Sequence, residues 1–312
     1  MKRVMVLRNP SASGGDVALD DALSLLHDVG IESHVHTPES AEHMRFLIRA
    51  GARTVDAVII GGGDGTVNAA LKAVLESGLP LGVLPLGTAN DLARTLGIPR
   101  DPCEACALIA SSTTRTIDVG WANNRPFLNA AGLGLSTQVA RRLTVEKKSV
   151  LGPLSYAAAV AEALRTHRPF RAQIRTATGT REVASIQITV GNGVYYGGGT
   201  PLGEDCAIDD GRLDLYSVRP QTVLRLLAVA FALRRGTHAQ LGAGVDTASG
   251  TEFEIVTRPR LTVSLDGEPA LETPVHFRVV PRGLTVFAPP PACDQEVMDR
   301  ESDHLGTGSA PR

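Results

Sequence analysis

The chain has 312 residues, 43% of them hydrophobic, and a formal net charge of −2. This length is enough for two domains with sizeable cores, and the nearly balanced charge provides no global basic field for nucleic acid. The first residues lack the pattern of a secretory signal, and no apolar run approaches the roughly 18 residues that span a bilayer. We therefore expect a cytoplasmic protein with no transmembrane span, no nucleic-acid partner and four reduced cysteines.

The first 120 residues alternate between apolar strand patterns and amphipathic helix patterns. The first helix is indicated by Leu19, Leu23 and Leu26, which recur on one face. Strands are predicted at residues 4–7, 31–37, 55–60 and 81–84, and further helices at 39–50 and 67–76. This order predicts an α/β domain whose parallel sheet carries helices on both faces.

The third predicted strand leads directly into a glycine-rich loop at residues 61–68, with the sequence Gly-Gly-Gly-Asp-Gly-Thr-Val-Asn. Glycines lack a Cβ atom, so backbone N–H groups can approach a phosphate closely. The helix expected to begin near Thr66 points its positive end at the same place. Asp64 would repel bare phosphate, so its position makes sense if a divalent cation bridges the two. The alternative is a tight strand-to-helix turn that merely needs glycine.

Three polar loops follow predicted strands, at residues 9–15, 61–68 and 87–91. The first reads Asn-Pro-Ser-Ala-Ser-Gly-Gly, and the last reads Gly-Thr-Ala-Asn-Asp. Ligands on parallel sheets bind outside the carboxyl ends of the strands. We therefore expect these three loops to converge on one ligand site.

Beyond residue 115 strand patterns dominate the chain. Strands are predicted at residues 117–121, 127–131, 170–176, 183–190, 212–218, 252–257, 261–265 and 275–280, with helices at 154–165 and 222–234. This pattern predicts a β-rich, sandwich-like second domain. We expect the first domain to cover residues 1–120 with a returning segment at 281–288, the second to cover 121–280, and a disordered tail to follow at 289–312.

Seven short motifs run in order along the chain: Asn9-Pro10 with Ser13-Gly14, then residues 62–68, 85–91, 118–120, 129–134, 209–211 and 265–269. Together they resemble the soluble lipid kinases that share the diacylglycerol kinase catalytic domain, a family that includes sphingosine and ceramide kinases. Gly-Gly-Asp-Gly-Thr alone is shared with NAD kinases and resembles the phosphofructokinase loop. Gly-Thr-Ala-Asn-Asp and the late Asp-Gly-Glu favour the lipid kinases.

The resemblance implies that ATP binds between the two domains, at a site that contains no Walker loop. The residues that it places around the nucleotide are Asn9, Pro10, Ser11, Ala12, Ser13, Thr37, Gly62, Gly63, Asp64, Gly65, Thr66, Val67, Asn68 and Thr88. It further implies that Asp64, Asp91 and Asp118 support a catalytic Mg²⁺, directly or through water. For Asp91 the alternative is a helix or turn cap.

Two further roles come from the resemblance. Glu268 matches the general base of the family, which acts on the acceptor hydroxyl in a site where Asp64 is also catalytic. A second, structural Mg²⁺ would be held by the side chain of Asp210 and the backbone oxygens of Ala207 and Arg212. The alternative for Asp210 is an ordinary Asp-Gly turn.

The resemblance implies an ATP- and Mg²⁺-dependent kinase that transfers the γ-phosphate to a lipid hydroxyl at a membrane surface, with phosphatidic acid expected as the product from diacylglycerol. The second domain would then be the lipid-substrate domain. The helix at 222–235 either packs on its own sheet or touches the membrane, and Arg141, Arg142, Lys147 and Lys148 form a solvated face or meet anionic headgroups. One alternative is an NAD kinase with a soluble dinucleotide substrate, and another is a non-enzymatic nucleotide- or lipid-binding protein. The acceptor lipid and the oligomeric state, including a homodimer, stay open.

Overall fold

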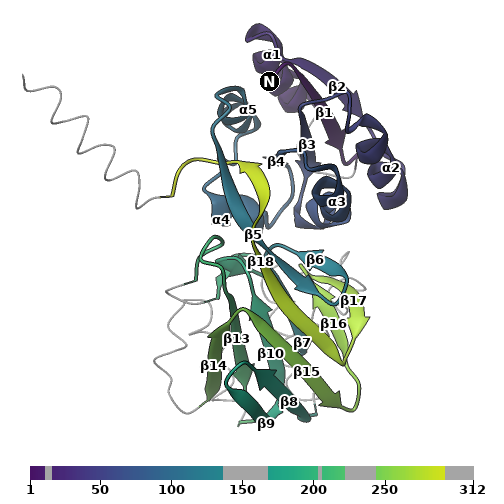
Figure 1. Ribbon diagram of the computed structural model, residues 1–312. Helices are drawn as coiled ribbons and strands as arrows, with labels where there is room; N and C mark the ends of the chain where they lie inside the picture. Colours follow the sequence, from purple (N-terminus) through teal and green to yellow (C-terminus); the bar gives the residue numbers. More distant parts are fainter. Residues whose placement is uncertain (11–15, 136–167, 203–205, 222–243, 292–312) are drawn as a thin grey trace, which may run out of the picture.

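The structure is a computed structural model that describes residues 1–10, 16–135, 168–202, 206–221 and 244–291. Two lobes are visible, an α/β lobe that holds β1 to β4 with their helices and a β-rich lobe that holds most of the later strands (Figure 1). The predicted helices at 154–165 and 222–234, the basic residues at 141–148 and the predicted tail from 292 onward lie outside the described residues.

The first lobe is a parallel sheet between two helical layers. Its strands are β1 (Arg3–Arg8), β2 (Glu32–His36), β3 (Ala57–Gly62) and β4 (Leu81–Pro85), in the spatial order β2-β1-β3-β4. Helices α1 (Asp16–Asp28) and α5 (Pro102–Ala110) contact each other on one face, and α2 (Ala41–Gly51) contacts α3 (Asp64–Ser77) on the other. A short helix, α4 (Asp91–Leu96), follows the loop after β4. The predicted α/β fold is confirmed.

Local sequence explains where these elements lie. Every residue of β3 and β4 is buried, as expected for parallel strands that are covered on both faces. Helix α2 begins after Ser40, whose side chain accepts a hydrogen bond from the His43 N–H at 3.1 Å. Helix α5 begins after Asp101, which caps it in the same way, with a proline at its first position. The sequence analysis missed α4 and α5, because helices of six and nine residues show too few turns for a periodic pattern.

Helix α3 begins at Asp64 and not near Thr66, as the sequence analysis had predicted. The helical hydrogen bonds start at the Gly63 carbonyl, which accepts from the N–H groups of Thr66 and Val67 at 2.9 and 3.1 Å. Thr66 does not act as the cap, because its Oγ1 accepts a hydrogen bond from the side-chain amide of Asn9 at 2.9 Å. Asp64 therefore lies in the first turn of α3 and not in a free loop.

The second lobe is a β-sandwich, which confirms the predicted second fold. One sheet has the order β14-β13-β10-β7-β16-β17 and contains β7 (Ala130–Gly134), β10 (Gln187–Gly191), β13 (Leu213–Val218), β14 (Val245–Gly250), β16 (Thr262–Leu265) and β17 (Glu268–Glu272). The strands that face it are β8 (Phe170–Thr176), β9 (Gly179–Ser185), β15 (Glu252–Arg258) and β18 (Val275–Phe287). Between them Phe127, Phe253 and Phe277 are fully buried, and the rings of Phe127 and Phe277 meet edge to face at 6.3 Å.

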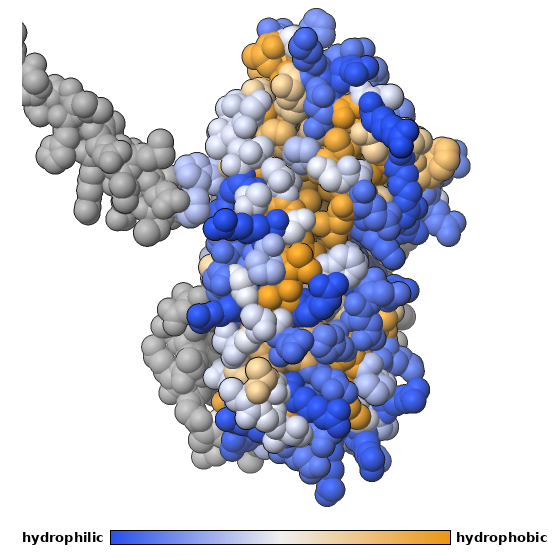
Figure 2. Space-filling view, viewed as in Figure 1, coloured by the Kyte–Doolittle hydropathy of each residue, from blue (hydrophilic) through white to orange (hydrophobic). Residues whose placement is uncertain are grey.

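Strands β5 (Thr114–Ala122) and β18 connect the lobes, and β6 (Arg125–Phe127) pairs with β5. Strands β5 and β18 pair antiparallel along their length, and β18 also pairs with β4 through Val286 and Leu81. One ten-stranded sheet therefore continues from lobe to lobe (Figure 1). Two apolar cores divide near the predicted boundary at residue 120, with Val119 in the first core and Ala122 in the second. Apolar residues also reach the surface in the middle of the face shown in Figure 2, among charged residues on both lobes.

Several predicted strand boundaries were wrong. The predicted strand at 127–131 is divided between β6 and β7, because the N–H groups of Leu128 and Asn129 donate to the Asp266 carboxylate and not to a neighbouring strand. The predicted strand at 275–280 continues through the predicted returning segment at 281–288 as one strand, β18, which contains a bulge between Val280 and Leu284. The predicted strand at 183–190 is divided between β9 and β10, and β14, β17 and the short pair β11 (Tyr195–Tyr196) and β12 (Thr200–Pro201) were not predicted.

Candidate active site

Four predicted nucleotide-binding positions lie at one edge of the first-lobe sheet. Because β2, β1, β3 and β4 are neighbouring parallel strands, their carboxyl ends place Thr37, Asn9, Gly62 and Thr88 along that edge in this order. The predicted positions 11–13 lie outside the described residues. The convergence that the sequence predicted is therefore present for the described part of all three loops.

Most glycines of the loop are required by packing inside the protein. A Cβ atom on Gly62 would lie 2.6 Å from Oγ1 of Thr66, and one on Gly87 would lie 2.5 Å from Cα of Gly63. The loops after β3 and β4 thus touch backbone to backbone. The sequence analysis left open that a tight turn alone requires the glycines of residues 61–68. Steric packing accounts for Gly62 and Gly63, and likewise for Gly87 in the next loop.

Gly65 differs from its neighbours. Within the described residues, the only atom within 4 Å of a Cβ on Gly65 would be Oε1 of Glu268, at 3.8 Å, and this carboxylate comes from the second lobe. Packing against the described part of the chain therefore does not require glycine at position 65. Its missing side chain leaves room between the first turn of α3 and Glu268.

Other predicted nucleotide-binding side chains contact the protein itself. Val67 is 3% exposed and packs in the first core, and Thr66 accepts the hydrogen bond from Asn9. Asn68 donates from Nδ2 to Oδ2 of Asp266 in the second lobe at 2.8 Å. Any direct contact of this part of the loop with a phosphate would therefore come from backbone groups.

Asp64 connects the two glycine loops. Its carboxylate accepts hydrogen bonds from the N–H groups of Asp91 and Leu92 at 3.0 Å each, so it satisfies two N–H groups at the start of α4. The side-chain amide of Asn129, from the second lobe, lies 3.4 Å from Oδ1 of the same carboxylate. Asp64 therefore has a structural role in addition to any catalytic one.

Asp91 is buried beside Asp64. Its Oδ2 accepts a hydrogen bond from the N–H of Gly198 in the second lobe at 2.8 Å. Burial raises the pKa of Asp91, and the Asp64 carboxylate adds to the rise, while the backbone N–H groups of Gly198 and Gly199 oppose it. Oδ1 of Asp91 is buried and has no hydrogen-bond partner among the described residues. This oxygen is an unsatisfied acceptor at the centre of the site.

The β16–β17 turn contributes two carboxylates from the second lobe. Asp266 has a positive φ of 47° and accepts hydrogen bonds from Asn68 and from the N–H groups of Leu128, Asn129 and Ala130, at 2.8 to 3.1 Å. Burial raises the pKa of Asp266, and these four hydrogen bonds oppose the rise. Asp266 is thus a structural anion that holds its neighbour Glu268 opposite Gly65.

We call this set the interlobe site and define it as Asp64, Asp91, Asn129, Asp266 and Glu268. The sequence analysis gave no role to Asn129 or to Gly198. Asn129 begins a motif, Asn-Ala-Ala-Gly-Leu-Gly, that contributed to the family resemblance, and Gly198 lies in the unusual run Tyr-Tyr-Gly-Gly-Gly. Both were visible as patterns, but only the fold shows that they meet carboxylates of the first lobe.

Asp118 lies with the predicted structural metal turn. Its carboxylate accepts from the N–H groups of Gly211 at 2.6 Å and Arg282 at 2.8 Å, and its own N–H donates to the Ile208 carbonyl. Burial raises the pKa of Asp210, and the carboxylates of Asp214 and Asp118 add to the rise. The sequence had grouped Asp118 with Asp64, whereas its hydrogen bonds in the structure tie it to the turn at 207–212.

The interlobe residues fit a magnesium ion that is shared with a phosphate. Among the described residues no three His, Cys, Asp or Glu side chains converge as a closed metal site would require. Mg²⁺ commonly keeps several waters and binds through one or two carboxylates together with substrate phosphates. Asp64 and Asp91 supply two carboxylates, and Oδ1 of Asp91 and Oδ1 of Asn129 are buried without partners in the described part of the chain. Each of these oxygens lacks the kind of partner that a cation would supply.

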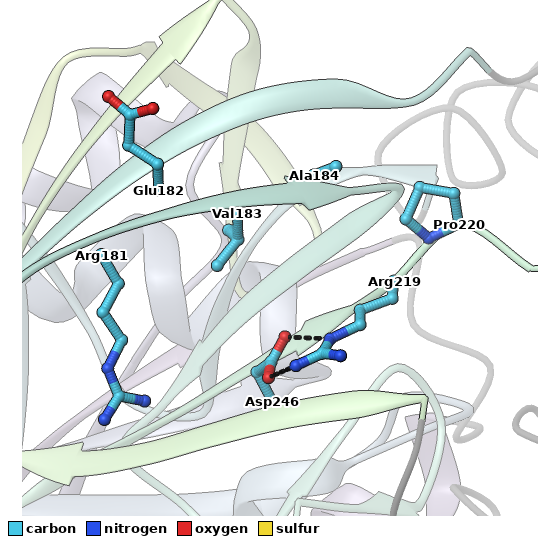
Figure 3. A pocket seen from close by; sticks show the side chains of 7 residues that line it. All are labelled: Arg181, Glu182, Val183, Ala184, Arg219, Pro220 and Asp246. Carbon is cyan, nitrogen blue, oxygen red and sulfur yellow. Dashed lines mark hydrogen bonds and ion pairs between the residues drawn. The ribbon is translucent and has the colours of Figure 1, made fainter.

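The cavity drawn in Figure 3, of about 570 Å³, lies away from this site. It is in the second lobe, between β9 and β14, where Arg219 pairs with both carboxylate oxygens of Asp246 (Figure 3). None of its lining residues belongs to the interlobe site. Cavity size therefore does not locate the predicted chemistry in this chain.

A glycine loop at the edge of an α/β sheet, facing a carboxylate on a β-sandwich, is the arrangement that the resemblance to the diacylglycerol kinase class led us to expect. Residues 3–122 match the family model for the diacylglycerol kinase catalytic domain. Residues 130–288 match that for the YegS C-terminal NAD kinase beta sandwich-like domain. The chain belongs to the YegS-like family of lipid kinases, which confirms the resemblance stated from the motifs.

Individual relatives agree with this assignment. The chain is 33% identical over 276 residues to "Probable lipid kinase YegS-like" of Klebsiella pneumoniae, covering 87% of this chain and 91% of that protein. It is 33% identical over 293 residues to "Probable lipid kinase YegS" of Salmonella arizonae. A crystal structure of a "putative diacylglycerol kinase" from Bacillus anthracis has a TM-score of 0.79 and 26% identity, over 93% of this chain and 98% of that one. No helix within the described residues is long and apolar enough to cross a membrane.

Asp64→Asn should reduce both stability and transfer. An asparagine retains one oxygen, so one of the two N–H groups at the start of α4 loses its acceptor, and we expect a loss of about 1 kcal/mol in the free energy of unfolding. Loss of the carboxylate charge should lower kcat by about 10²-fold or more. Urea denaturation and labelled-phosphate transfer measure the two effects. Asp101→Ala, which removes the cap of α5, is the control and should lose about 1 kcal/mol of stability without losing transfer. Near-normal kcat of folded Asp64→Asn at saturating Mg²⁺ would contradict the catalytic role.

Gly65→Ala should stabilise the protein and still reduce phosphate transfer. Alanine is favoured over glycine in helices by about 0.5–1 kcal/mol, and the new Cβ meets nothing closer than 3.8 Å. The methyl group would occupy the space in front of Glu268, so we expect a higher unfolding midpoint with a loss of transfer of about tenfold or more. Gly250→Ala, at the end of β14 and also free of clashes, is the control. Unchanged transfer in Gly65→Ala would show that reacting groups do not use this space.

Proposed function

We propose that the chain is an ATP- and Mg²⁺-dependent lipid kinase that transfers the γ-phosphate of ATP to a lipid hydroxyl, converting diacylglycerol to phosphatidic acid. The observation that carries this proposal is the position of Glu268 opposite Gly65. A carboxylate able to take a hydroxyl proton faces the turn where the phosphate loop becomes a helix. This arrangement supports the proposal that Glu268 acts as a base on a hydroxyl beside a phosphate-binding turn.

The first lobe supplies the elements of a nucleotide site. Helix α3 has 14 residues, and its first turn directs N–H groups and the positive end of its dipole toward the carboxyl edge of the sheet. Asn9, Thr37 and Thr88 lie along the same edge, and the last two are exposed. The nucleotide would therefore lie across the ends of β2, β1, β3 and β4.

Asp64, Asp91 and Asn129 are the residues proposed to hold the catalytic Mg²⁺. When bound, the ion would offset the charge of the phosphates during transfer. Asp64 gives its carboxylate to the start of α4, whereas Asp91 keeps one buried oxygen unpaired among the described residues. For the structural Mg²⁺ we propose Asp210 with the backbone of Ala207 and Arg212, and we place Asp118 beside that turn.

The second lobe has a second apolar cluster close to the reactive groups. On β13, Leu215 points into the sandwich core, whereas Tyr216 and Val218 join a separate apolar cluster that includes Ala130. Ala130 directly follows Asn129, whose amide meets Asp64. These side chains are buried, so apolar packing begins directly beside the reactive groups. This arrangement favours an amphipathic acceptor, met at a membrane surface, over a wholly polar one.

An acceptor screen tests the function directly. Full-length protein with labelled ATP and Mg²⁺ should phosphorylate diacylglycerol in mixed vesicles and yield phosphatidic acid. Parallel reactions with a sphingoid base, a monoacylglycerol and NAD identify other acceptors. Phosphorylation of NAD with no transfer to any lipid would support the NAD kinase alternative. Nucleotide binding without transfer to any acceptor would support a non-enzymatic role.

Glu268→Gln keeps the size of the side chain and removes its basic oxygen. We expect kcat to fall by about 10²-fold or more, the usual range for a general base, with little change in ATP affinity. Glu272→Gln, at the exposed far end of the same strand, is the matched control and should retain kcat. If Glu268→Gln instead weakened ATP binding and left kcat unchanged, Glu268 would belong to the nucleotide site.

A further inference from the structure

A glycine turn of the second lobe reaches the start of α4. Strands β11 and β12 form a separate two-stranded pair, and its tip is Gly197-Gly198-Gly199. All three glycines have positive φ, at 59°, 91° and 91°, a backbone conformation that side chains other than glycine resist. We name residues 195–201 the glycine hairpin. Its tip can present backbone N–H groups that an ordinary turn would not expose in this direction.

The glycine hairpin contacts α4 at successive positions. The N–H of Gly198 donates to Oδ2 of Asp91 at 2.8 Å, and the N–H of Tyr195 donates to Oγ1 of Thr95 at 3.4 Å. The guanidinium of Arg94 lies 5.6 Å from the centre of the Tyr195 ring, in cation–π contact. A Cβ on Gly199 would lie 2.5 Å from Nη1 of Arg94, so Gly199 is held closely against the helix.

The contact that reaches a carboxylate of the interlobe site most directly is the hydrogen bond from Gly198, and the N–H of its neighbour Gly199 also acts on that carboxylate. Tyr195, Arg94 and Thr95 can keep the hairpin on α4 without it. The Gly198 hydrogen bond engages one oxygen of Asp91 and leaves Oδ1 buried and unpaired within the described residues. A side chain fixed by one oxygen cannot rotate freely, so the direction of the other oxygen is determined. A substitution at Gly198 can therefore change the orientation of the Asp91 carboxylate while the hairpin stays packed on α4.

We propose that the Gly197–Gly199 tip is a positioning element for the phosphoryl transfer, through which the second lobe orients Asp91 so that its free oxygen can bind the cation. This inference rests on the proposed function. Two lobes then orient one carboxylate, because the backbone N–H of Asp91 is bonded to Asp64 of the first lobe while its side chain is bonded to Gly198 of the second.

The test compares substitutions of two glycines that both have positive φ, one in the glycine hairpin and one far from the interlobe site. Gly198→Ala forces alanine toward positive φ, with no atom near the new Cβ. Gly30→Ala has the same two properties, with φ of 79° and open space, but Gly30 lies before β2 at the opposite edge of the sheet. Gly198→Asn and Gly30→Asn form a milder pair, because asparagine tolerates positive φ better than alanine. The Asn pair serves if either Ala variant does not fold.

The main readout is cation binding and not turnover. Mn²⁺ binding in the presence of a non-hydrolysable ATP analogue, followed by electron paramagnetic resonance, should weaken about tenfold or more in Gly198→Ala, the scale expected for a lost hydrogen bond to a charged group. The affinity of Gly198→Asn for Mn²⁺ should lie between those of Gly198→Ala and the wild type. Both Gly30 variants should bind Mn²⁺ like the wild type while losing similar thermal stability.

The outcomes separate the two proposals. If the wild type binds Mn²⁺ with the analogue and Gly198→Ala binds it equally well, the positioning role is wrong and the proposed kinase site stands. If Gly30→Ala weakens Mn²⁺ binding as much as Gly198→Ala does, the effect is general destabilisation and the positioning role is again wrong. If the wild type shows no cation-dependent binding of the analogue, the proposed function fails and this inference fails with it.

Discussion

The contact on which the site depends is the carboxylate of Asp64 against the start of α4. Two hydrogen bonds of 3.0 Å join the first turn of α3 to the N–H groups of Asp91 and Leu92. They hold the loops after β3 and β4 so closely that Gly63 and Gly87 meet backbone to backbone. An asparagine at position 64 would keep only one of these two acceptors. The geometry of this edge of the sheet therefore depends on the carboxylate of Asp64.

The second lobe uses the same kind of interaction on a larger scale. Its β16–β17 turn holds α3 through Asp266 and Asn68, and its glycine hairpin holds α4 through Gly198 and Asp91. In each case a carboxylate on one lobe accepts hydrogen bonds from the other. Such contacts are directional, whereas apolar contacts tolerate sliding. The shared sheet of β5 and β18 connects the lobes, and these contacts determine how the helices face the sandwich.

Sequence reasoning identified the class of fold and singled out Asp64, Asp91 and Glu268, which the fold brings together, because local patterns carry both kinds of signal. Apolar runs separated by helices predicted the parallel sheet, and the charged residue after three glycines marked Asp64. What the sequence could not show were partners distant along the chain. Tertiary contacts decide that Gly63 has little room for a Cβ atom beside Gly87. They also decide that Asp118 lies with Gly211 and not with Asp64. Short helices such as α4 also gave no periodic signal, although α4 carries Asp91.

The charge of the interlobe site bears on how a nucleotide would enter it. The site contains four carboxyl groups, those of Asp64, Asp91, Asp266 and Glu268. A basic side chain, Arg94, lies close by on α4. Arg94 lies against the Tyr195 ring, so its charge is directed toward the hairpin. Triphosphate alone would meet repulsion in such a place, since like charges at short distance cost energy even in partly screened surroundings. Under the proposed function, a divalent cation and the nucleotide would therefore bind as a pair, each lowering the cost of admitting the other. This coupling explains why acidic residues occupy the end of a loop whose glycines would otherwise suit a bare phosphate.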